Sequence, residues 1–554
     1  ASLDKWFQYD SLSFRRVRLA FWNESVMTLR DQLSYEPQEL KFGTSGRRGP
    51  VVHLTQLEIY INARAELEYL LSLPASEGGI ARGEDFYLAC DLRPSSTEYV
   101  PAEQGRGEIA QAIVSAVRDA AMNPIYLGRI PTPALTFHAL SRGKGSIMVT
   151  GSHIPFDRNG YKLNTSRGEL LKQHEAPINQ AVARLRERMY AADAAACPFD
   201  EQGRFRSGHR DLPPVDDGAG QAYLDRYTSF IGGCGLEGRR ILAYQHSAVG
   251  RDLLVRLLES FGAEVIPAGR SDTFVPIDTE NIDAEQLQAI QRLADDAAAQ
   301  HGPLWAVAST DGDSDRPLIL GVDDGKVRFF PGDLLGMVVA EFLGADAVVV
   351  PISCNDAIDR GPLAAVTEPK TRIGSPFVIA GMEQARAQGR KVVCGWEANG
   401  GFLLGSDITR DGRTLAKLAT RDAFLPIACV LLAASRAGGS LGDLFAKLPK
   451  RFSRAALLRN FPRPVSMRIL ELSGLGDYFP ARNGFGPAVG FDYTDGVRIR
   501  FSNGEIAHIR PSGNADELRI YAVADTQERA DEIAALGVAE PDGILRRLER
   551  AVTQ

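Results

Sequence analysis

The chain of 554 residues lacks long apolar runs, an excess of positive charge and closely paired cysteines. No stretch reaches the ~18 uninterrupted apolar residues that a membrane-spanning helix needs. The net charge is −7 and no tract is dense in lysine and arginine, so the sequence gives no sign of a basic surface that would bind nucleic acid. The first twenty residues carry six charged side chains, which argues against a secretory signal. We therefore expect neither a membrane nor a nucleic-acid partner.

Cysteine usage indicates a cellular compartment. The six cysteines are scattered singly, without a CxxC pair, so buried free thiols in a reducing cytoplasm are the expected state. Hydrophobic residues make up 44% of the chain and charged residues 24%, which is ordinary globular composition. The length predicts roughly three to five domains. A cytoplasmic multidomain protein is the resulting expectation.

One pattern recurs along the chain: a short β-rich run ends in a polar or glycine-containing loop, and a helical stretch lies nearby. It occurs at residues 86–90, 146–150, 241–244 and 391–394. Strands interleaved with helices predict α/β domains with largely parallel sheets, whose ligands collect at the carboxyl ends of strands. After about residue 454 the runs alternate, which favours a small α+β domain with an antiparallel sheet. We predict three α/β domains with mixed, largely parallel sheets and this C-terminal domain around one central cleft.

Domain boundaries follow from linker composition and from shifts in the pattern. The stretch 211–218 is rich in proline and aspartate, a second break falls at 321–333, and a third follows 441–449. The predicted segments are 1–210, whose first forty residues are expected to form a helical extension, 211–325, 326–454 and 455–554.

Three aspartates alternate in the segment 310–317, directly after the apolar run 305–309: Asp311, Asp313 and Asp315. On an extended backbone such alternation points all three carboxylates the same way, and their repulsion is relieved by a cation. Oxygen ligands without histidine or cysteine favour Mg²⁺. An EF-hand needs Gly and Glu where Arg316 and Val322 stand, so that interpretation fails, while a plain acidic turn stays open.

Ser152 follows the predicted strand 146–150 in a turn that contains Gly151 and Pro155. An exposed hydroxyl there can be a nucleophile or a phosphoryl carrier, or it can simply form the turn. No G-x-S-x-G elbow is present, and the adjacent His153 is poorly placed as its base, which disfavours a Ser–His–Asp hydrolase.

Three further loops carry suitable chemistry. Two arginines, a serine and backbone amides in 508–519 could form a phosphate cradle, although a surface turn fits equally well. The glycine-rich loop 41–49 carries two arginines, and an ordinary β-turn is its alternative. Glu397 and Asn399 stand in a loop of small residues suited to sugar hydroxyls, but an isolated glutamate is often only solvated.

These loops occur in a fixed order: Gly-Thr-Ser-Gly, Ser-His-x-Pro followed by Asn-Gly-x-Lys, Asp-x-Asp-x-Asp-Arg, a glutamate loop, and Arg-x-Ser-Gly. In that order, from about Lys41 to the end, the chain resembles the α-D-phosphohexomutase superfamily of phosphomannomutases and phosphoglucomutases. The resemblance implies a Mg²⁺-dependent intramolecular phosphotransferase. It would interconvert hexose 6-phosphate and hexose 1-phosphate, of mannose or glucose, through a phosphoserine and a hexose 1,6-bisphosphate.

The resemblance also implies residue roles. Ser152 would carry the phosphoryl group, with Asp311, Asp313 and Asp315 holding Mg²⁺ together with a phosphate oxygen on that serine. The other catalytic candidates, which lie beside the transferring group or assist proton transfer, are Lys162, Arg47, His153 and Arg316. The substrate-binding candidates are Glu397, Asn399, Arg372, Gly374, Arg510, Ser512, Gly513, Asn514 and Arg519. The four segments would then be a phosphoserine, a metal-binding, a sugar-recognition and a phosphate-binding domain.

Some positions depart from the family pattern. Gly401 stands where many members have histidine, Asn399 where they have serine, and Asn514-Ala515 where they have Thr-Glu. The chemistry of phosphoryl transfer is untouched by these changes, but the identity of the sugar is not fixed by them. A phosphopentomutase and a sugar-phosphate-binding paralogue without turnover are the alternatives. A phosphosugar is the expected partner, and the oligomeric state is open.

Overall fold

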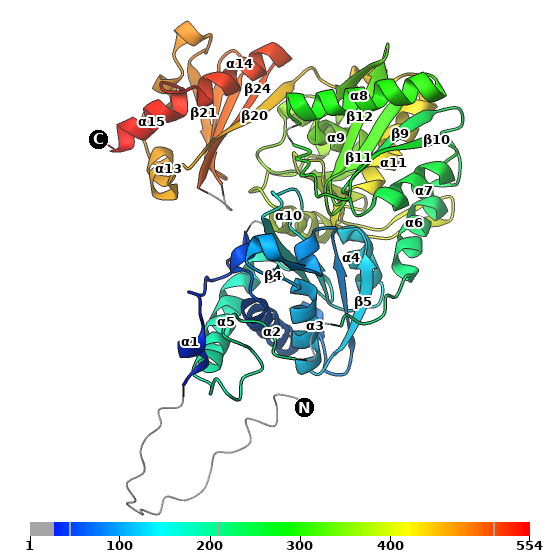
Figure 1. The fold of residues 1–554 in the computed structure, drawn as a ribbon. Coiled ribbons are helices and arrows are strands. Elements are labelled where there is room, and N and C mark those ends of the chain that lie inside the picture. Colours follow the sequence, from blue (N-terminus) through cyan, green and yellow to red (C-terminus); the bar gives the residue numbers. More distant parts are fainter. Residues whose placement is uncertain (1–26, 44–45, 208–210, 281, 513–515, 554) are drawn as a thin grey trace, which may run out of the picture.

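A computed structural model of the chain describes residues 27–43, 46–207, 211–280, 282–512 and 516–553. Four larger sheets follow one another along the chain, each with its own helices (Figure 1). No helix in the described ranges has the length and apolarity to cross a bilayer. Cys90, Cys197, Cys354, Cys394 and Cys429 are buried free thiols, as predicted, whereas Cys234 is a free thiol that is exposed.

The first unit is a mixed sheet in the order β1-β7-β6-β2-β5, in which β2 runs parallel to β5 and β6 and the β1–β7–β6 pairs are antiparallel. Its strands are β1 (Arg47–Pro50), β2 (Asp85–Cys90), β5 (Asn123–Arg129), β6 (Ser146–Val149) and β7 (Arg158–Thr165), with β8 (Gly168–Glu169) paired to β7. Its helices are α2 (Gln56–Ser72), α3 (Ile109–Asp119), α4 (Thr132–Leu140) and α5 (Glu175–Tyr190). The Thr55 hydroxyl caps α2 by accepting from the Glu58 N–H at 3.1 Å, which satisfies one orphan donor of the first turn.

The second unit is a sheet in the order β10-β9-β11-β12-β13, parallel through β11 and antiparallel afterwards. Its strands are β9 (Arg240–His246), β10 (Glu264–Arg270), β11 (Ala306–Thr310), β12 (Pro317–Asp323) and β13 (Lys326–Phe329). Its helices are α6 (Gly218–Ile231), α7 (Arg251–Ser260) and α8 (Ala284–His301). The predicted boundary after residue 325 falls inside the β12–β13 hairpin and is wrong by the length of β13, because the antiparallel pairing keeps that strand in this sheet.

The third unit is the sheet β14-β15-β16-β19. Its strands are β14 (Ala347–Val349), β15 (Val393–Trp396), β16 (Phe402–Leu404) and β19 (Leu418–Asp422), with a separate hairpin of β17 (Ile408–Arg410) and β18 (Arg413–Leu415). Its helices are α9 (Gly332–Leu343), α10 (Ser375–Ala387), α11 (Phe424–Arg436) and α12 (Leu441–Phe445). One hydrophobic core joins this unit to the second, because Ile241 and Ile319 belong to the same buried cluster as Trp396 and Phe424.

The C-terminal unit is a fully antiparallel sheet in the order β20-β24-β23-β22-β21. Its strands are β20 (Phe452–Arg459), β21 (Ala488–Asp492), β22 (Val497–Phe501), β23 (Ile506–Pro511) and β24 (Glu517–Ala524), and its helices are α13 (Arg463–Leu470), α14 (Gln527–Val538) and α15 (Ile544–Thr553). The predicted start at residue 455 cuts β20, which begins at Phe452. The predicted fold class is confirmed, with three mixed α/β units and this α+β unit.

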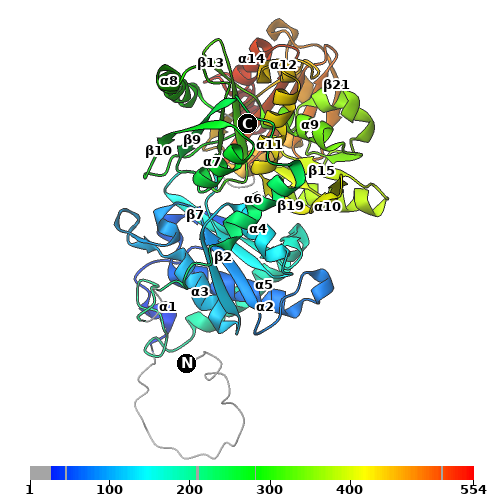
Figure 2. The same cartoon turned by 90° about the vertical axis from the view of Figure 1, so that its right-hand side faces the viewer.

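The four units have distinct places in the molecule. The first unit lies below the second and third in Figure 1, and the C-terminal unit stands apart at the upper left. The view turned by 90° shows the second and third units side by side above the first (Figure 2). Of the predicted helical extension, residues 1–26 lie outside the described residues, and the part at 27–40 contains one short helix, α1 (Leu29–Gln32).

Candidate active site

The turn after β6 holds Ser152 in a defined position. Asp91 Oδ2 accepts hydrogen bonds from the Thr150 hydroxyl at 2.8 Å and from the Gly151 N–H at 3.3 Å, and the Thr150 oxygen accepts from the Ser152 N–H at 2.7 Å. Ser152 adopts φ 56°, a left-handed conformation that a serine keeps only where its surroundings impose it. A Cβ at position 151 would lie 2.6 Å from the Arg93 guanidinium, so glycine is required there. The turn is therefore strained and rigid.

The aspartate loop is the connection of the β11–β12 hairpin, and it curls back on itself. Asp311 Oδ1 accepts from the N–H groups of Asp315 at 3.1 Å and Arg316 at 3.2 Å, and Ser314 adopts φ 56°. The predicted convergence of the three carboxylates occurs, but the predicted cause is wrong. A tight turn, and not alternation on an extended strand, brings the three ligand oxygens within 4.8 Å of one another.

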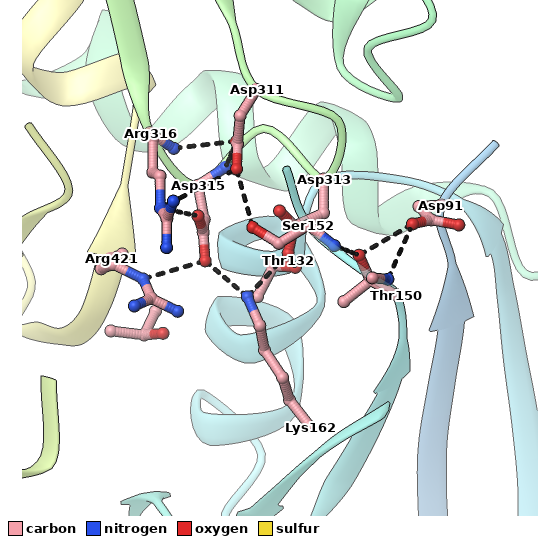
Figure 3. A network of polar contacts seen from close by, with 12 residues as sticks. Asp91, Thr132, Thr150, Ser152, Lys162, Asp311, Asp313, Asp315, Arg316 and Arg421 are labelled. Carbon is pink, nitrogen blue, oxygen red and sulfur yellow. Dashed lines mark hydrogen bonds and ion pairs between the residues drawn. The ribbon is translucent and has the colours of Figure 1, made fainter. Parts of the chain in front are cut away.

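The serine turn and the aspartate loop meet at the interface between the first and second units (Figure 3). The Ser152 hydroxyl donates to Asp311 Oδ2 at 2.8 Å. Lys162, on β7, donates from Nζ to Asp313 Oδ2 at 2.7 Å and to Asp315 Oδ2 at 2.6 Å. Residues about 150 positions apart in sequence thus form one buried polar cluster.

The cluster has the properties of a cation site. Burial, followed by the charges of Asp313 and Asp315, raises the pKa of Asp311 well above its usual value. Burial also acts to raise the pKa of Asp313, but the neighbouring Lys162 ammonium outweighs it and lowers that pKa. The Oδ1 atoms of Asp313 and Asp315 are buried and have no hydrogen-bond partner among the described residues. Orphaned carboxylate oxygens in this arrangement fit a hard divalent cation, so the three aspartates could hold a metal ion.

Arg47 does not face this cluster. β1 pairs antiparallel with β7, with Arg47 opposite Tyr161 and Arg48 opposite Gly160. Because side chains alternate across a sheet, Arg47 points to the face opposite that of Lys162, and its Nε donates to Glu66 at 2.6 Å inside the core. The prediction of Arg47 as a catalytic residue is thereby corrected.

Arg48 is the arginine on the same face as Lys162. Burial lowers its pKa to about 10, against the attraction of Asp313. Its guanidinium therefore lies within the electrostatic reach of the acidic cluster, where it adds positive charge.

His153 and Arg316 contact each other beside the serine. Arg316 Nη1 lies 2.7 Å from His153 Nδ1. Since a guanidinium can only donate, this ring nitrogen accepts, and the imidazole is neutral with its proton on Nε2. Burial, followed by the positive charge of Arg316, lowers the pKa of His153 well below its usual value, which agrees with that assignment.

Arg421, on β19, joins the aspartate loop to the loop of Glu397. Its Nε donates to Asp315 Oδ2 at 3.1 Å and its Nη1 to Glu397 Oε2 at 3.1 Å. Asn399 shapes the same loop, because its Oδ1 accepts from the Gly401 N–H at 3.0 Å. The predicted sugar loop is thus brought to the acidic cluster.

The predicted phosphate cradle lies on the C-terminal unit. Arg510 pairs with Asp495 at 3.0 Å and Arg519 with Glu517 at 3.0 Å, and Ser512 is buried. Gly513 and Asn514 lie outside the described residues. Arg372 and Gly374 belong to a loop of the third unit, and Arg372 Nε donates to the Thr494 carbonyl of the C-terminal unit at 3.2 Å.

An acid from the second unit, Glu280, also faces this region. Burial, followed by Asp278, raises its pKa to about 7, against the charges of Arg519 and Arg316. Glu280 lines a pocket of about 290 Å³ together with Ala398 and Tyr521. Residues of the second, third and C-terminal units therefore line this one pocket.

Sequence reasoning missed several residues of the site. Thr132 donates from its hydroxyl to Asp313 Oδ2 at 2.6 Å, and Asp91 holds the serine turn by accepting from the Thr150 hydroxyl. Arg421 and Glu280 carry no local motif, so no signal in the sequence marked them. Arg48 is the residue after the predicted Arg47. Because side chains alternate between the two faces of a strand, the position of Arg48 relative to Lys162 could have identified it.

Comparison with known proteins gives a consistent result. Three regions match the family described as phosphoglucomutase/phosphomannomutase: its alpha/beta/alpha domain I at residues 39–189, its alpha/beta/alpha domain III at 331–452, and its C-terminal domain at 469–537. A phosphomannomutase of Sinorhizobium fredii (strain NBRC 101917 / NGR234) is 37% identical over 502 residues, which cover 90% of this chain and 98% of the relative.

Two further relatives agree. A phosphomannomutase of Salmonella muenchen is 38% identical over 503 residues, which cover 89% of this chain and 94% of the relative. The crystal structure of a phosphoglucomutase/phosphomannomutase family protein from Burkholderia thailandensis aligns with a TM-score of 0.65, at 17% identity, over 94% of this chain and 98% of that protein. That alignment concerns the fold.

Proposed function

Because the chain belongs to the phosphoglucomutase/phosphomannomutase family and is an intramolecular phosphotransferase, we propose that it interconverts hexose 6-phosphate and hexose 1-phosphate, with mannose as the first candidate sugar. The observation that carries the proposal is the 2.8 Å contact between the Ser152 hydroxyl and Asp311 inside a buried acidic cluster. Mannose is favoured because relatives of 37% and 38% identity over most of the chain are phosphomannomutases.

Ser152 is the proposed phosphoryl carrier. A sugar hydroxyl attacks the phosphorus on Ser152 Oγ, the Oγ–P bond breaks, and the new O–P bond makes a hexose 1,6-bisphosphate. In this step the sugar hydroxyl loses a proton and the departing Ser152 Oγ gains one, so that the serine hydroxyl is restored. Lys162, whose ammonium pairs with Asp313 and Asp315, is the proposed residue that assists this proton transfer. The bisphosphate then turns around and returns its other phosphoryl group to Ser152. Such transfer needs positioning and charge neutralisation more than covalent activation.

The remaining residues divide between the two ends of the substrate. Arg48 and Arg316, with the neutral His153 that accepts from Arg316, would supply and orient positive charge around the transferring phosphoryl group. Asp311, Asp313 and Asp315 would hold Mg²⁺, which when bound offsets negative charge on the phosphoryl oxygens. The residues proposed to hold the sugar and the second phosphate are Glu397, Asn399, Arg372, Gly374, Arg510, Ser512, Gly513, Asn514 and Arg519. A cytoplasmic location is part of the proposal and is supported by the free thiols.

Replacing Ser152 by alanine tests the carrier. Incubation with hexose 1,6-bisphosphate labelled in its phosphate should leave label on the wild type and none on Ser152→Ala, and turnover should be lost. Binding of mannose 6-phosphate, measured by calorimetry, should persist, because the contacts proposed for its sugar and its phosphate do not involve the Ser152 hydroxyl. Ser72→Ala, at the exposed end of α2, is the matched control and should behave as the wild type. Label retained by Ser152→Ala would refute the carrier assignment.

The choice of sugar is tested separately. The wild type should convert mannose 1-phosphate, primed with a trace of the bisphosphate, with a higher kcat/KM than glucose 1-phosphate. Faster turnover of a pentose 1-phosphate would indicate a phosphopentomutase. Binding of phosphosugars without turnover of any would indicate a paralogue that has lost catalysis.

A further inference from the structure

A short turn of the C-terminal unit, residues 493–496 between β21 and β22, touches the third unit. Asp492 Oδ1 fixes the turn by accepting from the Thr494 N–H at 2.9 Å and from its hydroxyl at 2.7 Å. Gly496 adopts φ +73°, and a Cβ there would lie 2.3 Å from the Ile509 carbonyl oxygen. The conformation of the turn is therefore determined within its own sheet.

The backbone of the turn is also anchored to β23. His508 Nε2 lies 2.6 Å from the Asp495 carbonyl oxygen. Burial lowers the pKa of His508 to about 4, so its ring is neutral near pH 7 and donates to this carbonyl from Nε2. Arg510 lies two residues after His508 on β23, so the contact with His508 holds Asp495 at a fixed place relative to Arg510.

The Asp495 carboxylate is divided between two units. Its Oδ1 accepts from Arg510 Nε at 3.0 Å, within the C-terminal sheet. Its Oδ2 accepts from the Ile373 N–H at 3.0 Å, in the loop of the third unit that leads into α10. The adjacent Thr494 carbonyl accepts from Arg372 Nε at 3.2 Å. One carboxylate therefore joins a proposed phosphate-binding arginine to a proposed sugar-facing loop.

A second contact between the same two units has a different character. Arg451, at the start of the C-terminal unit, is 0% exposed and pairs with Asp356 of the third unit at 2.7 Å and with Asp525 at 2.6 Å. Asn355 Nδ2 donates to the Arg451 carbonyl at 3.0 Å. At Arg451 the chain itself passes between the two units and the arginine side chain is buried, whereas the contact at Asp495 is formed by hydrogen bonds between partly exposed groups. The junction at Arg451 suits a pivot, and the contact at Asp495 suits an interaction that opens and closes.

We infer that Asp495 is a positioning residue that closes the C-terminal unit onto the Arg372–Gly374 loop and aims Arg510 in the closed arrangement. The inference rests on the proposed function, because only there are Arg510 and Arg372 substrate contacts. A bisphosphate that must turn around needs a closure weak enough to release and specific enough to re-form. A few hydrogen bonds that share one carboxylate meet both requirements, since each has a modest net free energy in water.

Asp495→Asn tests this role, because it keeps the shape of the side chain and removes its charge. We expect the hexose 1,6-bisphosphate concentration for half-maximal activity to rise about tenfold, which corresponds to about 1.4 kcal/mol. We expect a much smaller change in kcat at saturating bisphosphate, since no group at Ser152 is altered. Asp495→Glu, which restores the charge, should recover part of the loss. Asp542→Asn is the matched control, because it removes the same charge from an exposed surface pair with Arg550 in the same unit.

A second measurement does not depend on turnover. Spin labels at Gln384 on α10 and Glu528 on α14, both exposed, report the distance between the two units in a Cys234→Ser background. Asp495→Asn should shift the distance distribution toward longer values, with an unchanged melting temperature, while Asp542→Asn should not. If the wild type converts no phosphosugar, the proposed function fails and these distances alone decide the inference.

Two results would overturn the inference. Asp495→Asn could match the wild type in the distance distribution, which would mean that the contact does not hold the units together. Alternatively the distances could shift while the bisphosphate requirement stays unchanged, which would mean that closure at this point does not position Arg510 for substrate.

Discussion

The correction at β1 can be tested by a pair of neighbouring substitutions, Arg47→Met and Arg48→Met. The Arg47 and Glu66 side chains are 2% and 0% exposed and lie 2.6 Å apart. Arg47 also donates to the Leu40 carbonyl and to Asn179. Methionine fills the space of the aliphatic stem but leaves the Glu66 carboxylate buried without its cation.

The expected loss of stability is large. Removing one partner of a buried ion pair costs about 3–5 kcal/mol, because the remaining charge stays desolvated. A domain has a total stability of about 5–15 kcal/mol, so the first unit should become marginal. Arg48→Met removes no such partner and should change the stability of the unit by less than about 1 kcal/mol. It should instead lower kcat/KM by about 100-fold, as expected for the loss of a charged group near the transferring phosphoryl.

The stability loss in Arg47→Met should depend on pH. Burial already raises the pKa of Glu66 in the wild type, and loss of the arginine raises it further. A carboxyl group with a higher pKa in the folded state than in the unfolded state binds more protons when folded, so stability falls as pH increases. The deficit relative to the wild type should be small near pH 4.5 and grow toward pH 8, by at most about 1.4 kcal/mol per pH unit.

Hydrogen exchange in increasing urea measures the first unit by itself, with peptides from α2 and β7 as reporters. This choice avoids the assumption that a multidomain chain unfolds in one step. Glu66→Gln in the Arg47→Met background should recover part of the lost stability, because a neutral amide is cheaper to bury. The reasoning is refuted if Arg47→Met keeps the stability of the wild type and loses activity, since Arg47 would then act in the site.

Three further results are expected. Asp313→Asn should raise the Mg²⁺ concentration needed for half-maximal activity and lower kcat together, measured by titrating MgCl₂ into protein treated with EDTA; an unchanged titration would remove Asp313 from the ligand set. Arg519→Ala should raise KM for mannose and glucose phosphates alike, by about 10- to 100-fold for a lost charged hydrogen bond, and an effect on one epimer alone would show that Arg519 reads the sugar. Asp422→Ala should destabilise the joined second and third units by about 2–4 kcal/mol, because Tyr223 and Tyr227 both donate to this carboxylate at 2.6 Å and lose a buried acceptor; calorimetry showing an unchanged transition would contradict this.

The features that the sequence predicted well are local. Ser152 and the three aspartates are each marked by a strand followed by a turn, whereas Lys162 was predicted from the family resemblance alone. The chemistry of carboxylates and hydroxyls is independent of the fold. The structure brings all five together. The alternation of strands and helices likewise predicted the fold class, because the pattern repeats in each unit.

The features that it missed depend on register and on distant parts of the chain. Whether Arg47 or Arg48 faces Lys162 is decided by which residue of β1 lies opposite Tyr161, and a shift of one residue exchanges the two faces. Arg421 reaches Asp315 across more than a hundred residues, so only the packing of β19 against the aspartate loop reveals it. The edges of the units were misplaced by a few residues because a hairpin or a strand start leaves little trace in composition.

The buried cluster shared by the second and third units sets a limit on how this chain can be divided. Ile241 and Ile319 on one sheet pack into the same interior as Trp396 and Phe424 on the other side. A polypeptide that ended at Phe329 would leave that apolar surface exposed to water, and we expect it to aggregate or to bind a separately supplied third unit. We therefore expect insertions, deletions and recombination events to be tolerated better at the ends of this pair of units than at the boundary between them.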